Sequence, residues 1–432
     1  MNKSLFIDLV EKFFPKLSLY IETINGSRGD KLTYLHKNPN ILRKEYSPDN
    51  KWESGAIHNA FVAADYVAVD AELPIKNRDT IAAANGKLPK IGIQKVLKES
   101  DINALNVMKA QGANGSTIAN KLAQDPVACD RGLDERNEYN FLFGLSNGYS
   151  AIVDEDNPHA LLRLNFNYLP EHCFGASVAG EVSLADIKNV LNKADEDGNT
   201  ITKIWIAKST YDKLRQTREA KELVANYNGQ VFSEGTNLAV PTATKFNEAF
   251  ADDNGGVEFQ VVDRSVQVEK NGKRQSVKPW NANKIIFVCN EMIGALVYGR
   301  LAEQSNPVQG VEYNLIEDYK LISKYSLVNP LREVTSGQAF VAPIIEDVDQ
   351  LYSLDISEAQ TVDTTAEGGD SSDAYITVWG AKYTKASFIT AMKSQGISIK
   401  ANATDEGVIK AINALSDADE AKLKAAVETY KA

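Results

Sequence analysis

The chain has few of the residues on which catalytic and metal sites are usually built. Its 432 residues include only four histidines and three cysteines, Cys129, Cys173 and Cys289. The cysteines are far apart, odd in number and without metal-ligand spacing, which predicts reduced, structural thiols. His36 and His58 also lack a partner at ligand spacing. This shortage argues against a metalloenzyme and against a disulfide-stapled scaffold.

Long apolar runs are also missing. No segment approaches the roughly 20 apolar residues of a membrane helix. The apolar start of the chain, Met1 to Leu9, is interrupted by Asp8 and then Glu11, so the uncharged core of a signal peptide is absent. These absences predict a soluble protein made in the cytoplasm. The 47 Lys+Arg against 58 Asp+Glu, with a net charge of −11, argue against a general basic surface for binding nucleic acid and leave only local basic patches open.

The totals are otherwise those of an ordinary globular protein. Hydrophobic residues make up 43% of the chain and charged residues 24%. A chain of this length can bury a large core, and its size predicts two or three domains.

The stretch from Leu97 to Ile152 predicts a helical spine. Ser100 is placed to cap a first helix, which Asn114-Gly115 breaks. A second, longer helix is expected to start near Pro126, which a first helical turn tolerates, and to stop at Asn147-Gly148. Apolar residues recur at helical spacing in both parts.

A long basic segment, 73–98, precedes this spine. It is too polar to form a core and too long for an ordinary connection. In a chain of net negative charge, such a loop finds acidic surface on another copy of the same chain. The alternative is a solvated hairpin. The predicted inter-subunit contacts are its cations Lys76, Arg78, Lys87, Lys90 and Lys95.

The first fifty residues predict an arm. An apolar stripe from Leu5 to Phe14 suits a short helix ending at Pro15, and the chain from Asn25 to Glu53 is polar with little periodicity. A helix packed on its own domain is the alternative.

An alternating α/β pattern begins near Ser183, which is placed to cap a helix. Strands are predicted at Lys203 to Ala207, Val257 to Val262 and Lys284 to Val288, and Ser209 is expected to cap another helix. Glu312 to Val328 is then predicted to be extended, and we expect it to come back to the first domain and pair beside the spine.

The end of the chain changes in composition. Glu333 to Ala381 contains no Lys or Arg, and the part after Asp355 has the composition of a linker. Beyond it, a strand at Tyr375 to Trp379 and a helix capped by Thr384 predict a small accessory module.

Two patterns that suggest chemistry have the wrong context. Gly144 to Gly148 fits the G-x-S-x-G expression of a hydrolase, with Ser146 as nucleophile. That motif requires a strand before the serine and a helix after it, whereas here a helix precedes. Asp195, Glu196 and Asp197 do not match a calcium loop, and a turn after a helix explains them better. We find no phosphate loop or dinucleotide fingerprint.

Several short segments follow one another in a characteristic order. They are Phe61-Val62-Ala63-Ala64-Asp65, Leu73 to Arg78, Gly86 to Gly92, Glu99 to Ile102, Glu135 to Glu138 with Gly144 and Gly148, and Tyr319 to Pro330. In these segments and their order, the chain resembles the major capsid proteins of tailed bacteriophages, of the Hong Kong 97-like fold and nearest the lambda-type (E-type) branch. The likeness covers about residues 1 to 350.

The resemblance implies an α+β fold with seven parts. These are an N-terminal arm (1–50), an extended loop (51–98), a peripheral domain with the spine helix (99–180), an axial α/β domain (181–300), a return to the peripheral domain (301–354), an acidic linker (355–373) and a C-terminal accessory module (374–432).

The resemblance also implies a structural role without an enzyme activity, cofactor or metal. Hexamers and pentamers would form the icosahedral head shell of a virion around double-stranded DNA, without sequence-specific or membrane binding. Portal, scaffold and decoration or head-completion proteins would be partners, and assembly would start in the host bacterial cytoplasm. Two alternatives are an encapsulin-like nanocompartment shell, which encloses an enzyme, and a serine hydrolase using Ser146.

Two departures from the family pattern add expectations. Only some fifty residues precede the extended loop, which implies a separate scaffold protein. The C-terminal module has no counterpart in the family core and is expected to project outward, as a decoration or a clasp. No lysine and asparagine pair is singled out for a crosslink, so none is predicted.

Overall fold

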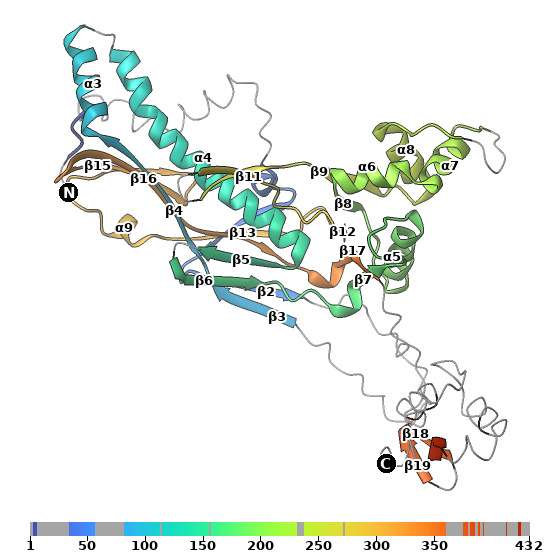
Figure 1. Cartoon of the computed structure of the whole chain (residues 1–432). Coiled ribbons are helices and arrows are strands. Elements are labelled where there is room, and N and C mark those ends of the chain that lie inside the picture. Colours follow the sequence, from blue (N-terminus) through green and yellow to red (C-terminus); the bar gives the residue numbers. More distant parts are fainter. Residues whose placement is uncertain are drawn as a thin grey trace, which may run out of the picture. The chain divides into compact units, whose positions relative to one another are not determined.

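The computed structural model describes residues 3–6, 34–56, 82–112, 115–154, 157–230, 237–270, 273–359, 375–378, 381–384, 388, 392, 412 and 422–424 (Figure 1). The chain divides into two compact units, Met1–Gln360 and Thr361–Ala432. Each unit is described by itself below.

Unit 1 contains a six-stranded sheet built mostly from the second half of the chain. Its strand order is β1-β13-β16-β15-β14. The long central strand β16 also pairs with β4, on the edge opposite β15. All pairs are antiparallel except β1 with β13. The strands are β1 (Leu42–Ser47), β4 (Lys90–Lys98), β13 (Gly294–Gly299), β14 (Glu312–Ile316), β15 (Lys320–Val328) and β16 (Leu331–Ile345).

The spine consists of α3 (Glu99–Ala110) and α4 (Gly115–Asn147), and α4 lies against β16 and β4 (Figure 1). At 33 residues, α4 is about 50 Å long. The predicted start at Pro126 is wrong, because the helix continues through this proline at the loss of one backbone hydrogen bond. Ser100 is not the cap either: α3 begins one residue earlier, where the Asp101 carboxylate accepts a hydrogen bond of 3.1 Å from the Lys98 backbone N–H.

Small residues allow α4 to lie close to the sheet. A Cβ atom on Gly132 of α4 would come within 2.8 Å of Ile93, and one on Gly337 of β16 would come within 3.0 Å of Cys129. A larger residue at Gly132 would displace the end of the Ile93 side chain, and one at Gly337 would press on the Cys129 Cβ atom of the helix.

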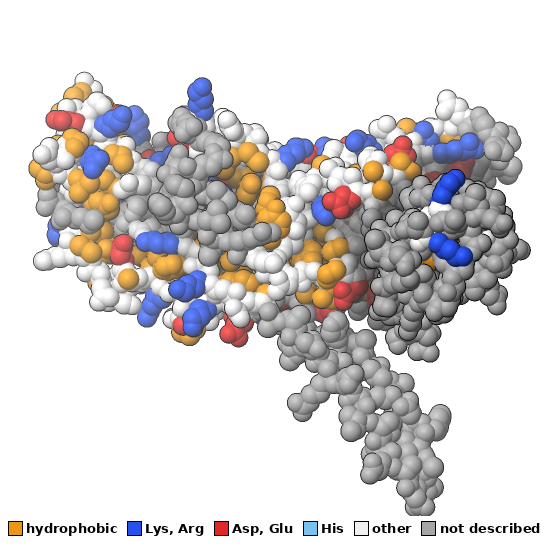
Figure 2. All heavy atoms as spheres, turned by 60° about the horizontal axis from the view of Figure 1, so that its bottom comes forward, with side chains coloured by type: hydrophobic (Ala, Val, Ile, Leu, Met, Phe, Trp, Pro, Cys, Tyr) orange, Lys and Arg blue, Asp and Glu red, His pale blue; other side chains and the backbone are white. Residues whose placement is uncertain are grey.

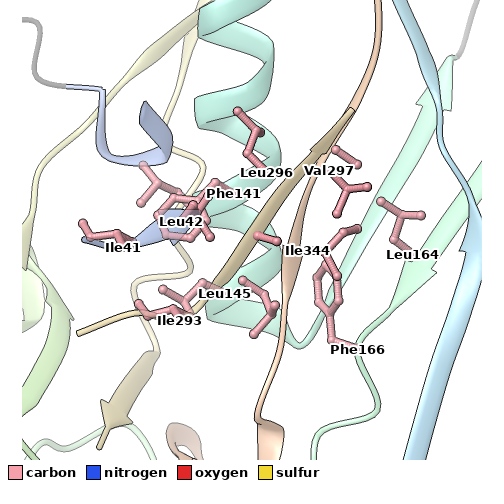
Figure 3. Packing of buried hydrophobic residues seen from close by; sticks show 14 of the residues in the cluster. Ile41, Leu42, Phe141, Leu145, Leu164, Phe166, Ile293, Leu296, Val297 and Ile344 are labelled. Atoms are coloured by element: carbon pink, nitrogen blue, oxygen red, sulfur yellow. The ribbon is translucent and has the colours of Figure 1, made fainter. Parts of the chain in front are cut away.

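The core of this half lies between α4 and the sheet. Phe141 and Leu145 of α4 meet Leu296 of β13 and Ile344 of β16 in a cluster of buried side chains (Figure 3). Each such side chain contributes about 1.5–3 kcal/mol by leaving water. A smaller apolar cluster, which includes Ile102 of α3 and Leu122 of α4, fills the other end.

A five-stranded sheet forms the second half of unit 1, in the order β7-β17-β12-β8-β9. Its strands are β7 (Cys173–Ala176), β8 (Lys203–Ala207), β9 (Glu258–Val262), β12 (Lys284–Val288) and β17 (Leu351–Ala359). The helices α5 (Leu184–Glu196), α6 (Lys208–Gln216), α7 (Arg218–Tyr227) and α8 (Ala243–Asp253) pack on it around a second core.

Several predictions for this half are confirmed and one is wrong. The strand at Lys203–Ala207 and the Ser183 cap, which accepts a hydrogen bond from Ala185, are as predicted. Ser209 is not a cap, since α6 starts at Lys208. The predicted axial boundaries, 181–300, differ from the sheet, which takes in β7 and β17 but leaves β13 to the six-stranded sheet.

The remaining elements of unit 1 are short. Three isolated strand pairs are β2 (Lys51–Ala56) with β3 (Ala82–Lys87), β5 (Tyr149–Asp154) with β6 (Asn157–Asn165), and β10 (Val266–Lys270) with β11 (Lys273–Val277). The short helices are α9 (Ala302–Ser305), η2 (Leu35–Lys37), η3 (Pro170–His172) and η4 (Val348–Gln350). The β2–β3 pair forms the base of the predicted extended loop, whose residues 57–81 lie outside the described residues.

In unit 2, β18 (Tyr375–Val378) pairs with β19 (Ala381–Thr384). The first of these strands was predicted. Phe388, Met392, Ile412 and Leu423 are buried. The rest of the predicted helix capped by Thr384, and most of the predicted arm, lie outside the described residues.

The linker prediction starts too early. β17 continues to Ala359, Ile356 is buried, and Asp355 forms an ion pair of 2.7 Å with Lys284 of β12. Residues 355–359 therefore belong to the five-stranded sheet. Among the described residues, no helix has the length and apolarity needed to cross a membrane.

A matched pair of truncations tests this boundary. A chain ending at Gln360 should unfold at the same temperature as unit 1 of the full chain, because both cores stay intact. A chain ending at Leu354 loses the Ile356 side chain and the Asp355 ion pair, and its free energy of unfolding should fall by about 3 kcal/mol. Differential scanning calorimetry measures both. Failure of the longer truncation to fold would contradict the division.

Candidate assembly surfaces and the charge network beneath them

An acidic stripe runs along the buried side of α4. Asp130, Asp134 and Glu138 are spaced four residues apart, so they lie on one face of the helix. All three side chains are buried. Buried carboxylates require compensating charge, because desolvation otherwise costs several kcal/mol for each ion.

Lys320, the first residue of β15, supplies much of this charge. Its fully buried ammonium group lies 2.6 Å from Asp130 Oδ1, 3.0 Å from Asp134 Oδ1 and 3.3 Å from Glu317 Oε2. Burial alone would lower the pKa of Lys320, but the three carboxylates raise it above its ordinary value. Lys320 therefore stays charged and joins the hairpin of β14 and β15 to the spine.

Residues 34–37 bind the same stripe from the N-terminal side. Glu138 accepts hydrogen bonds from the backbone N–H groups of Leu35 and His36 at 3.2 and 3.1 Å, and pairs with His36 Nδ1 at 2.7 Å. Lys37 Nζ lies 2.6 Å from Asp134 and 2.8 Å from Glu317. This short segment, which lies within the predicted arm (1–50), is thus fixed to α4 by charge.

A third connection comes from the chain after β9. Arg264 donates to Glu135 of α4 at 2.6 Å, and Tyr34 donates to the same carboxylate at 3.0 Å. The Arg264 guanidinium also lies 5.0 Å from the centre of the Tyr34 ring. The spine is therefore linked by charged groups to three segments that are far apart in sequence.

His36 is a protonatable member of this network. Burial would lower its pKa, yet Asp134 and Glu138 raise it above the ordinary value of about 6.5. Its Nε2 atom lies 3.9 Å from Asp134 Oδ1, too far for a hydrogen bond. A protonated His36 would face a carboxylate on each side of its ring.

The five cations predicted to contact another copy have different places in the structure. Lys76 and Arg78 lie outside the described residues. Lys87, at the end of β3, and Lys90, at the start of β4, are exposed. Lys95 is half-buried on the side of β4 that faces α4, near Asp125, whose pKa is raised by burial and lowered by Lys324 and Lys95. Lys95 thus faces the spine helix of its own subunit, and its predicted contact with another copy stays a prediction.

The hydrolase motif does not form a catalytic site. Ser146 is buried, its hydroxyl donates to the Phe143 carbonyl at 3.2 Å, and it accepts a hydrogen bond from the Asn281 backbone at 3.2 Å. Its partners end the helix and hold the chain before β12. Asp197 lies at the end of α5 and pairs with Lys193 at 2.7 Å, as the helix-turn interpretation requires. Within the described ranges, no group of three metal-ligating side chains comes together.

Residues 33–314 match the family model described as Phage major capsid protein E. The chain belongs to this family. The match covers the anchored segment 34–37, the base of the extended loop, the spine and four strands of the five-stranded sheet. The protein is therefore a structural subunit of a phage head shell and a component of the virion, rather than an enzyme. Neither the hydrolase nor the nanocompartment alternative is supported by this match.

Solved structures with similar folds are distant in sequence. The Cyanophage A-1(L) capsid protein is 12% identical with a TM-score of 0.43, covering 74% of this chain and 92% of that one. A prophage capsid protein from E. coli CFT073 is 10% identical with a TM-score of 0.42, covering 64% and 79%. The SrpI encapsulin of Synechococcus elongatus PCC 7942 is 12% identical with a TM-score of 0.33, covering 74% and 87%. A comparison with curated proteins finds no match.

Sequence reasoning missed the charge network. The available signal was the spacing of Asp130, Asp134 and Glu138 beside the apolar residues of α4, which places carboxylates near its buried face. Their partners could not be assigned, because Lys37 and Lys320 are separated from them by about a hundred residues or more.

Replacing the central cation tests the network. Lys320→Met leaves two buried carboxylates without their shared partner, and should lower the free energy of unfolding by about 3–5 kcal/mol. Adding Asp130→Asn should restore part of this loss, because Asp134 keeps Lys37. Lys213→Met, at an exposed position of α6, is the matched control. Equal stabilities of Lys320→Met and the control in urea unfolding would contradict the assignment.

The raised pKa of His36 predicts a pH dependence with a definite sign. The stabilisation from protonated His36 should be fully present below pH 6.5 and be lost as the pH rises through the raised value. His36→Gln should remove this alkaline decline in the free energy of unfolding. His172→Gln should keep the alkaline decline, since burial lowers the pKa of His172 and its own contribution to stability therefore changes at acid pH. An unchanged decline in His36→Gln would contradict the assignment of this pH dependence to His36.

Proposed function

We propose that this chain assembles into the hexamers and pentamers of an icosahedral head, in the Hong Kong 97-like arrangement. The family match over residues 33–314 is the observation that carries the proposal. The six-stranded sheet with α4 would be the peripheral domain, and the five-stranded sheet with α5 to α8 the axial domain around each capsomer centre.

In this arrangement the arm and the extended loop reach neighbouring copies. Residues 34–37 of the arm are bound to α4 of their own subunit, and the loop starts from the β2–β3 pair. Lys76, Arg78, Lys87 and Lys90 would contact a neighbour. In support, Lys87 and Lys90 are exposed and form no ion pair with any residue in the described part of the chain.

The proposed partners follow from this role. The shell would enclose double-stranded DNA without reading its sequence, which agrees with the net charge of −11. A separate scaffold protein, a portal and decoration or head-completion proteins would complete the head. Unit 2 would project outward, which its separation as a compact unit supports. Labelling of intact particles with an antibody against unit 2 tests this. An antibody that binds disrupted particles but not intact ones would overturn it.

Expression of the protein alone tests the shell function. Negative-stain electron microscopy should show rings, tubes or closed shells, because every copy carries both donor segments and acceptor surfaces. A protein that stays a stable monomer at high concentration would contradict the proposal.

Charge reversal of the loop tests the inter-subunit contacts. Lys76→Glu, Arg78→Glu and Lys87→Glu together should impair assembly more than folding, since these side chains would meet only a neighbour. The control keeps the charge, with Lys76→Arg, Arg78→Lys and Lys87→Arg. Light scattering measures assembly and circular dichroism measures folding. Loss of the folded monomer to the same extent as assembly would refute the assignment.

A further inference from the structure

The chain crosses between the six-stranded and the five-stranded sheet of unit 1 at two neighbouring points. Residues 289–293, the first crossing, connect β12 to β13, and residues 346–350, the second crossing, connect β16 to β17. The Cys289 N–H donates to the Gln350 carbonyl at 3.3 Å, and a second backbone hydrogen bond of 3.0 Å joins the other ends of the two segments. The two crossings therefore form one paired junction between the sheets.

The short helix η3 also reaches this junction. It lies between β6, which pairs with β5, and β7, an edge strand of the five-stranded sheet. His172, the last residue of η3, stacks on the ring of Tyr352 in β17, with ring centres 4.1 Å apart and an angle of 21° between the planes. Tyr352 is the second residue of β17, so the stack joins η3 to the end of the second crossing.

Polar groups around the stack complete this link. The Tyr352 hydroxyl donates to Asp197 Oδ2 at 3.1 Å and accepts a hydrogen bond of 2.9 Å from the Asn199 side chain. Asn199 also donates to the Asp349 carbonyl of the second crossing at 3.1 Å. The turn after α5, η3 and η4 thus meet around one histidine ring. We name His172, Asp197, Asn199, Asp349 and Tyr352 the junction cluster.

His172 is the member of the junction cluster that changes charge near neutral pH. Figure 2 shows Lys, Arg, Asp and Glu side chains spread over one face of the molecule, where water solvates them. His172 is instead 8% exposed. Its Nδ1 atom is buried without a hydrogen-bond partner in the described structure, and its Nε2 atom lies 3.7 Å from Asp197 Oδ2, too far for a hydrogen bond. A protonated ring would therefore bury an N–H group that has no acceptor.

The ionisable groups that face His172 in the described structure are acids. They are Glu171 of η3 itself, Asp197 after α5, Asp349 of η4 and the phenol of Tyr352 in β17. Lys193 lies one step away and pairs with Asp197 Oδ1 at 2.7 Å, so it competes for this carboxylate. Burial lowers the pKa of His172 by more than the carboxylates raise it. The cluster therefore holds the neutral ring more firmly than the protonated one.

We propose that His172 is an acid-sensitive lock on the junction between the two sheets. The neutral ring holds η3 against the second crossing, and protonation releases it into water. A second contact between the halves is apolar, because Phe141 of α4 packs edge-on against Trp205 of β8 with ring centres 6.1 Å apart. That contact does not titrate, so acid would loosen one side of the junction and leave the other in place, as in a hinge. This inference concerns contacts within one chain and goes beyond the shell function.

Proton linkage gives the sign and the size of the effect. Opening of the junction exposes His172 to water, where its pKa is about 6.5, whereas its pKa in the closed junction is lower. The closed junction is therefore most stable at neutral and alkaline pH, and it loses stability as the pH falls below about 6.5. At pH 5.5, the equilibrium constant for opening should be about three to ten times its value at pH 7.5.

Hydrogen–deuterium exchange of the unassembled subunit tests the lock. The wild-type protein is compared with His172→Phe, which keeps an aromatic ring against Tyr352 but cannot be protonated. Peptides that cover residues 289–293 and 346–350 report on the two crossings. The ratio of their exchange rates, wild type over variant, should rise about three- to tenfold from pH 7.5 to pH 5.5. Taking the ratio at each pH cancels the intrinsic dependence of amide exchange on pH.

A second variant and two controls complete the design. His172→Gln removes both the charge and the ring, and it should lose the acid response as His172→Phe does, which separates protonation from stacking. His36→Gln should keep the wild-type acid response, because the pKa of His36 is raised and its effect falls at higher pH. Peptides from β8 should give a rate ratio that does not change with pH, since this strand lies in the cores and outside the junction cluster.

Two results would overturn the lock. One is a rate ratio at the crossings that stays constant with pH, and the other is an acid response in both His172 variants equal to that of the wild type. If one variant does not fold, the other decides. An NMR titration of the four histidines in the wild-type protein gives an answer that needs no folded variant. A pKa of His172 clearly below 6.5 supports the lock, and a pKa at or above 6.5 contradicts it.

Discussion

The buried carboxylates of α4 impose the constraint on which the rest of unit 1 depends. Asp130, Asp134 and Glu138 are stable inside the protein only if cations reach them. Those cations are Lys37 and Lys320, together with His36 when it is protonated, and they come from segments far apart in the chain. The requirement for charge compensation therefore fixes the arm, the spine and the β14–β15 hairpin relative to one another, while apolar burial fixes the sheet beneath them.

This arrangement suits the proposed shell subunit. Segments that reach a neighbour would need firm attachment, because a contact on a neighbour transmits force to the point where the segment leaves its own subunit. Residues 34–37 are bound to the charge network, and the β2–β3 pair holds Trp52 in the main core.

The sequence predicts those elements whose signals lie within a few residues, and it does not predict contacts between distant segments. The strand Lys203–Ala207 and the Ser183 cap could be predicted, because a β-branched run and a capping serine act within a few residues. Pro126 was misinterpreted as a helix start, because packing of α4 on β16 outweighs one missing hydrogen bond. The partners of Asp130 and Asp134 could not be found, since no local pattern connects them to Lys320.

Hydrogen–deuterium exchange, compared peptide by peptide between the unassembled subunit and the assembled shell, tests most directly whether the subunit is completed by its neighbours. The α4 peptides and residues 34–37 should be protected in both states, because their partners lie within one chain. Peptides from residues 57–81 should gain protection only in the shell. If those loop peptides are already fully protected in the isolated subunit, the loop rests on its own chain and the account is wrong.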